Sequence, residues 1–320
     1  ARVRSAAGGM VNAVLRRVAQ EGDGLWAGAD RLRLDSPAWL WDSWIAAYGE
    51  PVTRAIAAAH LVEAPLDITP KAEPALWAER LQAELLPTGT LRRAAGGRIE
   101  ELPGYAEGAW WVQDAAAALP ARLLGDVAAR HVVDLCAAPG GKTLQLAAAG
   151  ARVTAVDLSA KRLKRVAENL KRIGLSATLV AADGATWRPD SPPDAVLLDA
   201  PCSATGTLRR HPDIAWLKSE TDVARLATVQ ATLLERAIAM VRPGGLVVYA
   251  VCSLQPQEGP ARVTAHVNAG IVERVPLMPS EVGGLAEAIT PEGDLRTLPS
   301  MWPDRAGMDG FFAARLRRLT

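Results

Sequence analysis

The second half of the chain alternates between two kinds of segment, and this alternation limits the possible folds more than any other feature of the sequence. From residue 131 onward, short apolar runs rich in β-branched residues are separated by longer helix-like stretches. Such runs suit strands that are buried on both faces. The runs are HVVDLCA, RVTAVDL, ATLVAAD, DAVLLDA and GLVVYAVCS, and a later one, FFAARL, is expected to add an edge strand. The pattern predicts a doubly wound α/β fold, in which ligands bind at the carboxyl ends of the strands.

The chain before this region has a different texture. Apolar residues at helical spacing between Gly9 and Val18, and the stretch AWLWDSWIAAYG after Ser36-Pro37, predict helices. The following residues mix a strand-like LDIT, a helix-like ALWAERLQAELL and glycine-rich turns. We therefore predict a helical segment over residues 1–60, a small α+β domain over 61–118 and the α/β domain over 119–320.

Charge and cysteine content exclude several classes of protein. The 36 basic and 35 acidic residues give a formal net charge of +1, so any nucleic-acid site must be a local basic patch. Three cysteines cannot form a paired disulfide framework, which favours a reducing compartment and a cytoplasmic location. No apolar stretch reaches the roughly 18 residues of a membrane-spanning helix, and no secretory signal is visible. We therefore expect no membrane partner.

The ends of the first three predicted strands carry residues suited to a cofactor. The loop LCAAPGGKT after the first strand has Gly140 and Gly141, which allow a ligand close to the backbone before a helix begins. It matches neither a phosphate-binding P-loop, because Cys136 stands at the leading glycine position, nor the three-glycine dinucleotide motif. Asp157 can accept hydrogen bonds from both ribose hydroxyls, and Asp183 is placed to meet an adenine amino group. Each aspartate alone is commonly a turn former, but together they suit an adenosyl ligand without phosphate, and S-adenosylmethionine fits that description.

Two cysteines also stand at the ends of predicted strands. Cys202 follows Asp-Ala-Pro after one strand, and Cys252 ends the next, so both thiols can face one pocket. Cys136 is instead expected to be a small buried side chain whose backbone lines the cofactor loop. A zinc site formed by Cys202, Cys252 and His211 is disfavoured, because these residues lack the spacing that is usual for zinc ligands. We therefore predict no metal.

Several motifs resemble one enzyme family. LCAAPGGKT, VDLSAKRLKRVAENLKRIG, LLDAPCSATGTLRRHPD, YAVCS and DGFF resemble the Nol1/Nop2/Sun family of RNA cytosine-C5 methyltransferases, in order over residues 112–319. The resemblance implies a Rossmann-like S-adenosylmethionine-dependent methyltransferase domain with a seven-stranded, mostly parallel sheet. Among family members, the sequence is most similar to a bacterial subgroup that acts on small-subunit ribosomal RNA. Residues 1–60 resemble the end of that subgroup's NusB-like domain and its linker, most of the NusB-like domain being missing, and 61–118 resemble its small RNA-binding domain.

The resemblance also implies roles for individual residues. Cys252 would add to C6 of cytosine, which makes C5 nucleophilic enough to accept a methyl group, and Cys202 would serve product release. Asp199 would hydrogen-bond the cytosine edge and stabilise its protonated form. One departure from the family is Val251, which stands where threonine is usual. The residues expected to contact S-adenosylmethionine, or its product S-adenosylhomocysteine, are Cys136, Ala137, Ala138, Pro139, Gly140, Gly141, Lys142, Asp157, Arg162, Asp183 and Asp199.

The expected RNA contacts follow the release cysteine. Arg209, Arg210 and His211 are expected on a surface loop, where phosphate contact is favoured over a merely solvated loop. The predicted function is methylation of C5 of a cytosine in 16S ribosomal RNA through a covalent cysteine intermediate, by a monomer. Two alternatives stay open. The chain could catalyse the same chemistry on transfer RNA or another RNA, or it could be a non-catalytic RNA-binding or ribosome assembly factor. A DNA methyltransferase is disfavoured, because those enzymes use the Pro-Cys cysteine as the nucleophile.

Overall fold

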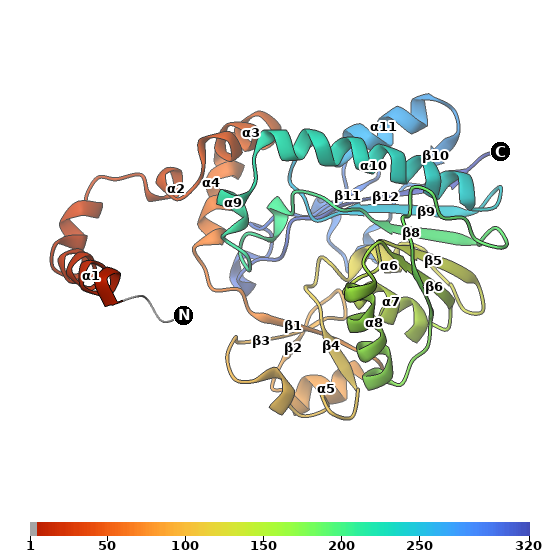
Figure 1. Cartoon of the computed structure of the whole chain (residues 1–320), viewed down its shortest axis with the longest axis horizontal. Coiled ribbons are helices and arrows are strands. Elements are labelled where there is room, and N and C mark those ends of the chain that lie inside the picture. The colour runs from red at the N-terminus through yellow and green to blue at the C-terminus, as the bar shows by residue number, and fades with distance from the viewer. Residues whose placement is uncertain (1–4) are drawn as a thin grey trace.

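Four helices form the first part of the chain in the computed structural model, which describes residues 5–320 (Figure 1). They are α1 (Ser5–Trp26), α2 (Arg31–Leu34), α3 (Ala38–Tyr48) and α4 (Glu50–His60). The helices predicted near Gly9 and after Pro37 are confirmed. In Figure 1, α1 lies at one end, apart from the rest of the molecule. Its apolar residues Met10 and Leu15 are exposed by 68% and 59%, so this helix adds little to the core.

Helices α3 and α4 pack on the body of the protein. Leu40 and Trp44 of α3 and Ile56 of α4 are buried in one cluster with Leu208 and Leu254. The last two residues belong to the loops that carry Cys202 and Cys252. The helical segment therefore supports the backbone around both thiols through apolar contacts.

A small antiparallel sheet follows α4. Its strand order is β2-β3-β1-β4, and helix α5 (Pro74–Arg80) packs on it. Ile68, Leu81, Leu91 and Trp110 form its own buried core. The strands are β1 (Leu66–Pro70), β2 (Glu84–Leu85), β3 (Leu91–Arg93) and β4 (Trp110–Val112). We propose that this unit corresponds to the predicted small domain over residues 61–118, between the segments 1–60 and 119–320.

The large sheet confirms the predicted mostly parallel α/β fold. Seven strands follow the order β10-β12-β9-β8-β5-β6-β7. An eighth strand, β11 (Leu295–Arg296), pairs antiparallel with β12. The pairs among β5, β6, β7, β8 and β9 are all parallel. The strands are β5 (His131–Leu135), β6 (Arg152–Asp157), β7 (Thr178–Ala181), β8 (Ala195–Asp199), β9 (Leu246–Val251), β10 (Val272–Arg274) and β12 (Phe312–Arg318).

The last strand does not lie where the sequence suggested. We expected the run FFAARL to form an edge strand, and this was wrong, because β12 lies between β9 and β10 and pairs antiparallel with both. Phe312 and Ala314 are fully or almost fully buried. The apolar residues of β12 are therefore explained by an interior position.

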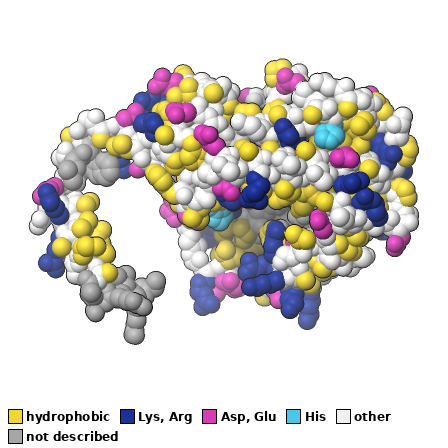
Figure 2. Space-filling model, turned by 45° about the horizontal axis from the view of Figure 1, so that its top comes forward, with side chains coloured by type: hydrophobic (Ala, Val, Ile, Leu, Met, Phe, Trp, Pro, Cys, Tyr) yellow, Lys and Arg dark blue, Asp and Glu magenta, His cyan; other side chains and the backbone are white. Residues whose placement is uncertain are grey.

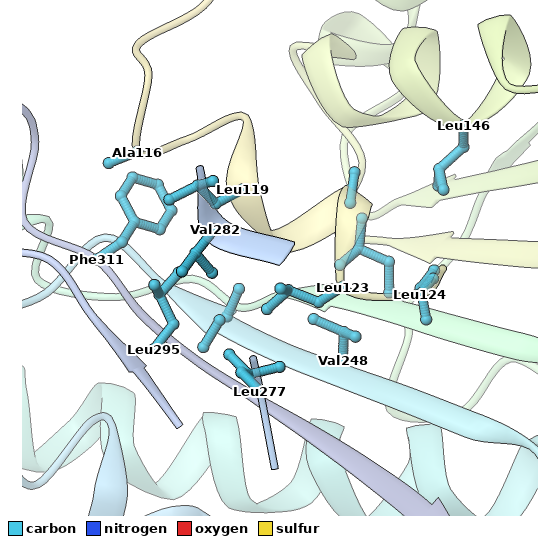
Figure 3. Packing of buried hydrophobic residues seen from close by; sticks show 14 of the residues in the cluster. Ala116, Leu119, Leu123, Leu124, Leu146, Val248, Leu277, Val282, Leu295 and Phe311 are labelled. Atoms are coloured by element: carbon cyan, nitrogen blue, oxygen red, sulfur yellow. The ribbon is translucent and has the colours of Figure 1, made fainter. Parts of the chain in front are cut away.

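Helices cover both faces of the large sheet. On one face, Leu146 of α7 (Gly141–Ala148) packs with Val132 and Val248 and with α6 (Leu119–Arg122), as Figure 3 shows for part of this cluster. On the other face, the neighbouring strand residue Val133 packs with α10 (Glu220–Met240). Successive strand residues thus enter different cores, as expected for a sheet that is buried on both sides.

The strand order indicates where on the large sheet a ligand is expected to bind. The chain runs from β5 to β6 on one side and later returns to β8 on the other side of β5. The carboxyl ends of β5 and β8 therefore form the topological switch point, where ligands bind in sheets of this kind. The loop of residues 136–142 and Asp199 both lie at this edge. Within residues 5–320, no helix is both long and apolar enough to cross a membrane.

Candidate active site

The loop after β5 is shaped by its backbone. Cys136 has φ +65° and Gly140 has φ +106°, both in the left-handed region. A Cβ atom added to Gly140 would lie 3.1 Å from a methyl group of Val166 on α8 (Ala160–Ile173), so a side chain there would be crowded as well as strained. The loop therefore passes close to α8 and leads directly into the amino terminus of α7.

Asp157 and Asp183 stand at the ends of the next two strands, as predicted. Asp157 is buried, and its carboxylate accepts hydrogen bonds from the backbone N–H groups of Ala138 at 3.1 Å and Ser159 at 2.9 Å. Arg162 lies 3.5 Å from it. Asp183 is exposed, and its carboxylate accepts a hydrogen bond from the backbone N–H of Ala185 at 2.9 Å. Asp157 therefore braces the 136–142 loop in addition to any contact with a ligand.

Two residues suited to the same cofactor were missed by the sequence analysis. Leu158 directly follows Asp157 and is 76% exposed, so it offers an apolar surface at the strand end. Asp134 is fully buried; its Oδ2 accepts a hydrogen bond from Thr143, while Oδ1 has no partner among the described residues. Burial raises the pKa of Asp134 to about 7. An unpartnered buried oxygen beside a glycine loop, two strand-end carboxylates and an exposed apolar side chain fit an adenosyl cofactor with an amino-acid tail.

Both predicted thiols meet at this edge. The Cys202 and Cys252 sulfur atoms are 3.4 Å apart. Cys252 lines a cavity of about 500 Å³, whose walls, as far as the chain is described, do not include Cys202. The hydrogen bond with Cys252, together with burial, raises the pKa of Cys202 well above its usual range. Cys202 is thus held as a protonated thiol whose sulfur is in contact with that of Cys252.

Asp199 and Lys142 form an ion pair in the same cavity. Lys142 Nζ lies 2.8 Å from Asp199 Oδ2 and 5.2 Å from the centre of the Phe311 ring. Burial lowers the pKa of Lys142, but the negative charge of Asp199 raises it, and the net shift is upward. The lysine therefore stays charged although its side chain is buried. It also interacts electrostatically with Cys252, which lines the same cavity.

The arginines after Cys202 are not arranged as expected. Arg209 is buried rather than on a surface loop, and it forms ion pairs with Asp114 at 3.2 Å and Asp309 at 3.7 Å. Arg210 also pairs with Asp309, although its side chain is 37% exposed. His211 is exposed. The expected surface position was wrong for Arg209, because Asp114 and Asp309, which are distant in sequence, hold its side chain in the interior.

Residues 121–317 match the family model described as 16S rRNA methyltransferase RsmB/F, which covers more than half of the chain. The chain belongs to this family. The resemblance to the Nol1/Nop2/Sun methyltransferases, and to their bacterial ribosomal RNA subgroup, is confirmed.

Relatives of the RsmB/F family extend beyond this chain. Ribosomal RNA small subunit methyltransferase B of Salmonella arizonae is 43% identical over 223 residues, which are 68% of this chain and 49% of that protein. The protein of the same name from Serratia proteamaculans is 46% identical over 192 residues, covering 57% of this chain and 45% of that protein. The chain thus spans about half the length of these curated relatives.

Solved structures support the RsmB/F fold. The crystal structure of PH0851 has a TM-score of 0.79 at 26% identity and covers 91% of this chain and 69% of that one. A methyltransferase homologue from Pyrococcus horikoshii has a TM-score of 0.75 at 25% identity and covers 91% of this chain and 98% of that one. NSun6 from the same organism, solved with SFG, has a TM-score of 0.75 at 19% identity, which shows the shared fold alone.

Three further observations concern Val251, Cys136 and possible metal ligands in this RsmB/F site. Val251, where the family usually has threonine, is buried in the core beside β12, and nothing in its surroundings explains the departure. The backbone of Cys136 belongs to the loop, and burial raises the pKa of its thiol to about 12. Among the described residues, no group of three or more His, Cys, Asp or Glu side chains could hold a metal ion.

Proposed function

We propose that this chain transfers a methyl group from S-adenosylmethionine to C5 of a cytosine in small-subunit (16S) ribosomal RNA, through a covalent bond between Cys252 and C6. The observation that carries this proposal is the arrangement of the thiols, since the two sulfur atoms are 3.4 Å apart and, of the two half-buried cysteines, Cys252 lines the cavity. Asp199 and Lys142 line the same cavity. The family resemblance assigns the roles of Cys252, Cys202 and Asp199. The proposal includes a monomeric enzyme in the cytoplasm.

The cofactor residues would hold S-adenosylmethionine along the carboxyl edge of the sheet. The backbone of Cys136, Ala137, Ala138, Pro139, Gly140, Gly141 and Lys142 would enclose it, with Asp157, Arg162, Asp183 and Asp199 as polar contacts. When bound, the cofactor supplies a methyl group that is electrophilic because it is attached to a positively charged sulfur. Asp157 would accept hydrogen bonds from the ribose, and the exposed Leu158 would cover one face of the adenine.

The first step is attack by Cys252. Its sulfur adds to C6 of the cytosine, and the ring becomes an enamine whose C5 is nucleophilic. Lys142 and Arg210 both interact electrostatically with Cys252, so the negative charge of the attacking sulfur faces two cations. Asp199 would hydrogen-bond the cytosine edge and stabilise a proton on N3, and Lys142 fixes the position of this carboxylate.

The second step is release of the methylated base. The C5 proton passes to a base, the electron pair of the C5–H bond restores the C5–C6 double bond, and the electron pair of the S–C6 bond returns to the Cys252 sulfur, which the Cys202 thiol can protonate. Cys202 is in contact with the leaving sulfur and is held as a thiol, which suits a group that assists release rather than attack.

A basic surface borders the cavity. The exposed side chains of Lys161, Lys164 and Arg165 on α8, with Arg162, surround a hollow of about 590 Å³. Pro139 lines both this hollow and the central cavity, so the two adjoin. Figure 2 shows a hollow in the middle of the face drawn, with dark blue Lys and Arg side chains at its border. This patch would bind RNA phosphates, together with His211 and the exposed part of Arg210, whereas the buried Arg209 would act by holding the loop.

Replacing Asp183 by alanine should weaken S-adenosylmethionine binding about ten- to a hundredfold, because a charge-assisted hydrogen bond worth roughly 1.5–3 kcal/mol is lost. Isothermal titration calorimetry would measure this, with thermal unfolding as the control for an intact fold. Asp157→Ala should weaken binding similarly but also lower stability, because the Ala138 N–H loses its acceptor. Unchanged affinity in both variants would contradict the proposed cofactor site.

RNA binding should weaken as salt rises, because binding to phosphates releases counterions. Lys161→Ala with Arg165→Ala should reduce the slope of log affinity against log salt by about one unit for each lost phosphate contact. The matched control is Arg130→Ala with Arg152→Ala, which removes two cations at the opposite edge of the sheet, where β5 and β6 begin. Filter-binding titrations with small-subunit ribosomal RNA would compare the slopes. Equal slopes for wild type and the α8 variant would show that the patch is only solvated.

Two alternatives can be separated from the proposal by one assay. Transfer of tritiated methyl groups from S-adenosylmethionine to ribosomal RNA, but not to transfer RNA, is the expected result. Transfer to transfer RNA alone would indicate the same chemistry on another substrate. Binding of RNA without any transfer would favour a non-catalytic assembly factor, against which the intact Asp199, Cys202 and Cys252 argue.

A further inference from the structure

Glu258 is a buried carboxylate that joins the two loops carrying the thiols. It lies after β9, and its side chain has no exposed surface. Its Oε1 accepts hydrogen bonds from the backbone N–H of Ser203 at 2.8 Å and from Gln230 Nε2 at 3.1 Å. Its Oε2 accepts hydrogen bonds from the hydroxyls of Ser203 and Ser253, both at 2.5 Å. Ser203 and Ser253 directly follow the two cysteines, so one carboxylate binds both loops beside their sulfur atoms.

The surroundings of Glu258 point to a positional role. Its hydrogen-bond donors in residues 5–320 are all neutral, and burial of a charge without a cationic partner is costly. A fully hydrogen-bonded polar network of this kind specifies one arrangement of the groups that it joins. Here the groups are the two thiol loops, and the arrangement is a sulfur-to-sulfur distance of 3.4 Å.

Other contacts between the loops do not replace this carboxylate. Gly206 donates a backbone hydrogen bond to the carbonyl of Cys252 at 3.0 Å, and Leu254 donates one to the Thr205 hydroxyl at 3.1 Å. The Ser253 hydroxyl also lies 3.2 Å from the Ser203 hydroxyl and 3.3 Å from the Thr205 hydroxyl, but the single proton of each serine hydroxyl is donated to Glu258. The bonds from Gly206 and Leu254 keep the loops folded, while Glu258 fixes the residues next to the sulfur atoms. The negative charge of Glu258 also adds to the effects that raise the pKa of Cys202, after the hydrogen bond to Cys252 and burial.

We propose that Glu258 is a positioning residue that keeps the Cys202 and Cys252 sulfur atoms in contact and thereby governs the release of product, not the attack or the binding of RNA. The contact between the sulfur atoms is a property of the free protein. The effect on release rests on the proposed function. The two parts can be tested separately.

The contact can be tested without RNA by oxidation with diamide. The two thiols together give up two protons and two electrons to diamide, which becomes a hydrazine, and a disulfide forms. In the wild type we expect a bond between Cys202 and Cys252, identified by mass spectrometry of proteolytic peptides. In Glu258→Ala its formation should be slower by on the order of tenfold, because the sulfur atoms are no longer aligned.

Two conservative variants of Glu258 separate the effect of its side-chain length from the effect of its charge. Glu258→Gln keeps the length of the side chain, and the serine hydroxyls can accept hydrogen bonds from its amide, so its oxidation rate should be near that of the wild type. Glu258→Asp keeps the charge but is too short to bind both loops, so oxidation should be slow. This comparison decides the matter if the alanine variant fails to fold. Equal rates in the aspartate, glutamine and wild-type proteins, or no disulfide in the wild type, would overturn the proposal.

Asp294→Asn is a matched control. Asp294 is also buried, at 2% exposure, and it pairs with Arg274 at 3.2 Å, but none of its hydrogen bonds joins the thiol loops. This variant should lose stability without a change in the oxidation rate. A slowed rate in Asp294→Asn equal to that in Glu258→Asp would show that general destabilisation explains the effect, and the proposal would fall.

The role in release is tested by a double-mutant cycle on an enzyme that methylates RNA. Glu258→Asp should lower the release rate in single-turnover experiments while KM for RNA and the rate of attack change little. In a Cys202→Ala background, the same substitution should add almost nothing, because its effect is exerted through Cys202. If the double variant showed a loss in release rate equal to the product of the two single losses, Glu258 would act independently of Cys202. If the wild type methylates no RNA, the proposed function fails, and the oxidation experiment still decides the positional claim.

Discussion

Cys202→Ala should accumulate protein covalently bound to RNA, whereas Cys252→Ala should form no adduct and lose methyl transfer by on the order of 10⁴-fold or more. The reason is the position of the two thiols. In the proposed mechanism, Cys252, which lines the cavity, attacks, and Cys202, whose sulfur lies 3.4 Å from that of Cys252, assists release. Without Cys202, attack and methylation proceed but elimination stalls. A denaturing gel with labelled RNA and S-adenosylmethionine would show a slow-migrating band for Cys202→Ala.

The double variant is the control for this experiment. With both cysteines replaced, no band should appear, which assigns the adduct to Cys252. An adduct that appears only in Cys252→Ala would make Cys202 the nucleophile, as in the DNA enzymes. Methyl transfer that persists in every variant without any adduct would exclude a covalent mechanism.

Asp199→Ala should lower kcat by about 10²–10³-fold, because an electrostatic contact to the cytosine edge is lost. It also leaves the buried Lys142 without its partner at 2.8 Å. Breaking a fully buried pair costs about 3–5 kcal/mol. Since the Asp199 side chain is 32% exposed, the free energy of unfolding should fall by less than this. Steady-state kinetics and urea unfolding would measure the two effects.

Asp199→Asn separates these two consequences. The amide oxygen can still accept a hydrogen bond from Lys142, so stability should recover in part, whereas the negative charge needed at the cytosine edge is absent. We therefore expect kcat to remain low in Asp199→Asn. A variant with nearly wild-type kcat would show that the charge of Asp199 has no part in catalysis.

The sequence predicted those features that depend on local patterns. Strands such as Arg152–Asp157 and Leu246–Val251 are short, apolar and rich in β-branched residues, which is why the α/β fold could be predicted. The order of parallel strands then brings the carboxyl ends of β8 and β9 together, so Cys202 and Cys252 had to lie near each other. The position of β12 could not be predicted in this way, because its antiparallel pairing is set by contacts between distant segments.

The same reason explains the errors at the site. Arg209 looks like a surface charge in the sequence, and only the fold brings Asp114 and Asp309 to it across about a hundred residues on each side. Glu258 gave no signal in the sequence, because its proposed role depends on hydrogen bonds to Ser203 and Ser253, which lie on two loops that meet only in the folded protein. Leu158 could have been found, since an apolar residue directly after a strand-end carboxylate has no place in the core.

Bisulfite mapping of small-subunit ribosomal RNA tests the central claim most directly. RNA lacking the modification would be incubated with S-adenosylmethionine and either the wild-type chain or Cys252→Ala. We predict a cytosine that becomes resistant to deamination only with the wild type, since methylation at C5 slows the reaction of the base with bisulfite. No resistant cytosine in either sample, or the same resistant cytosine in both, would contradict methylation of this RNA through Cys252.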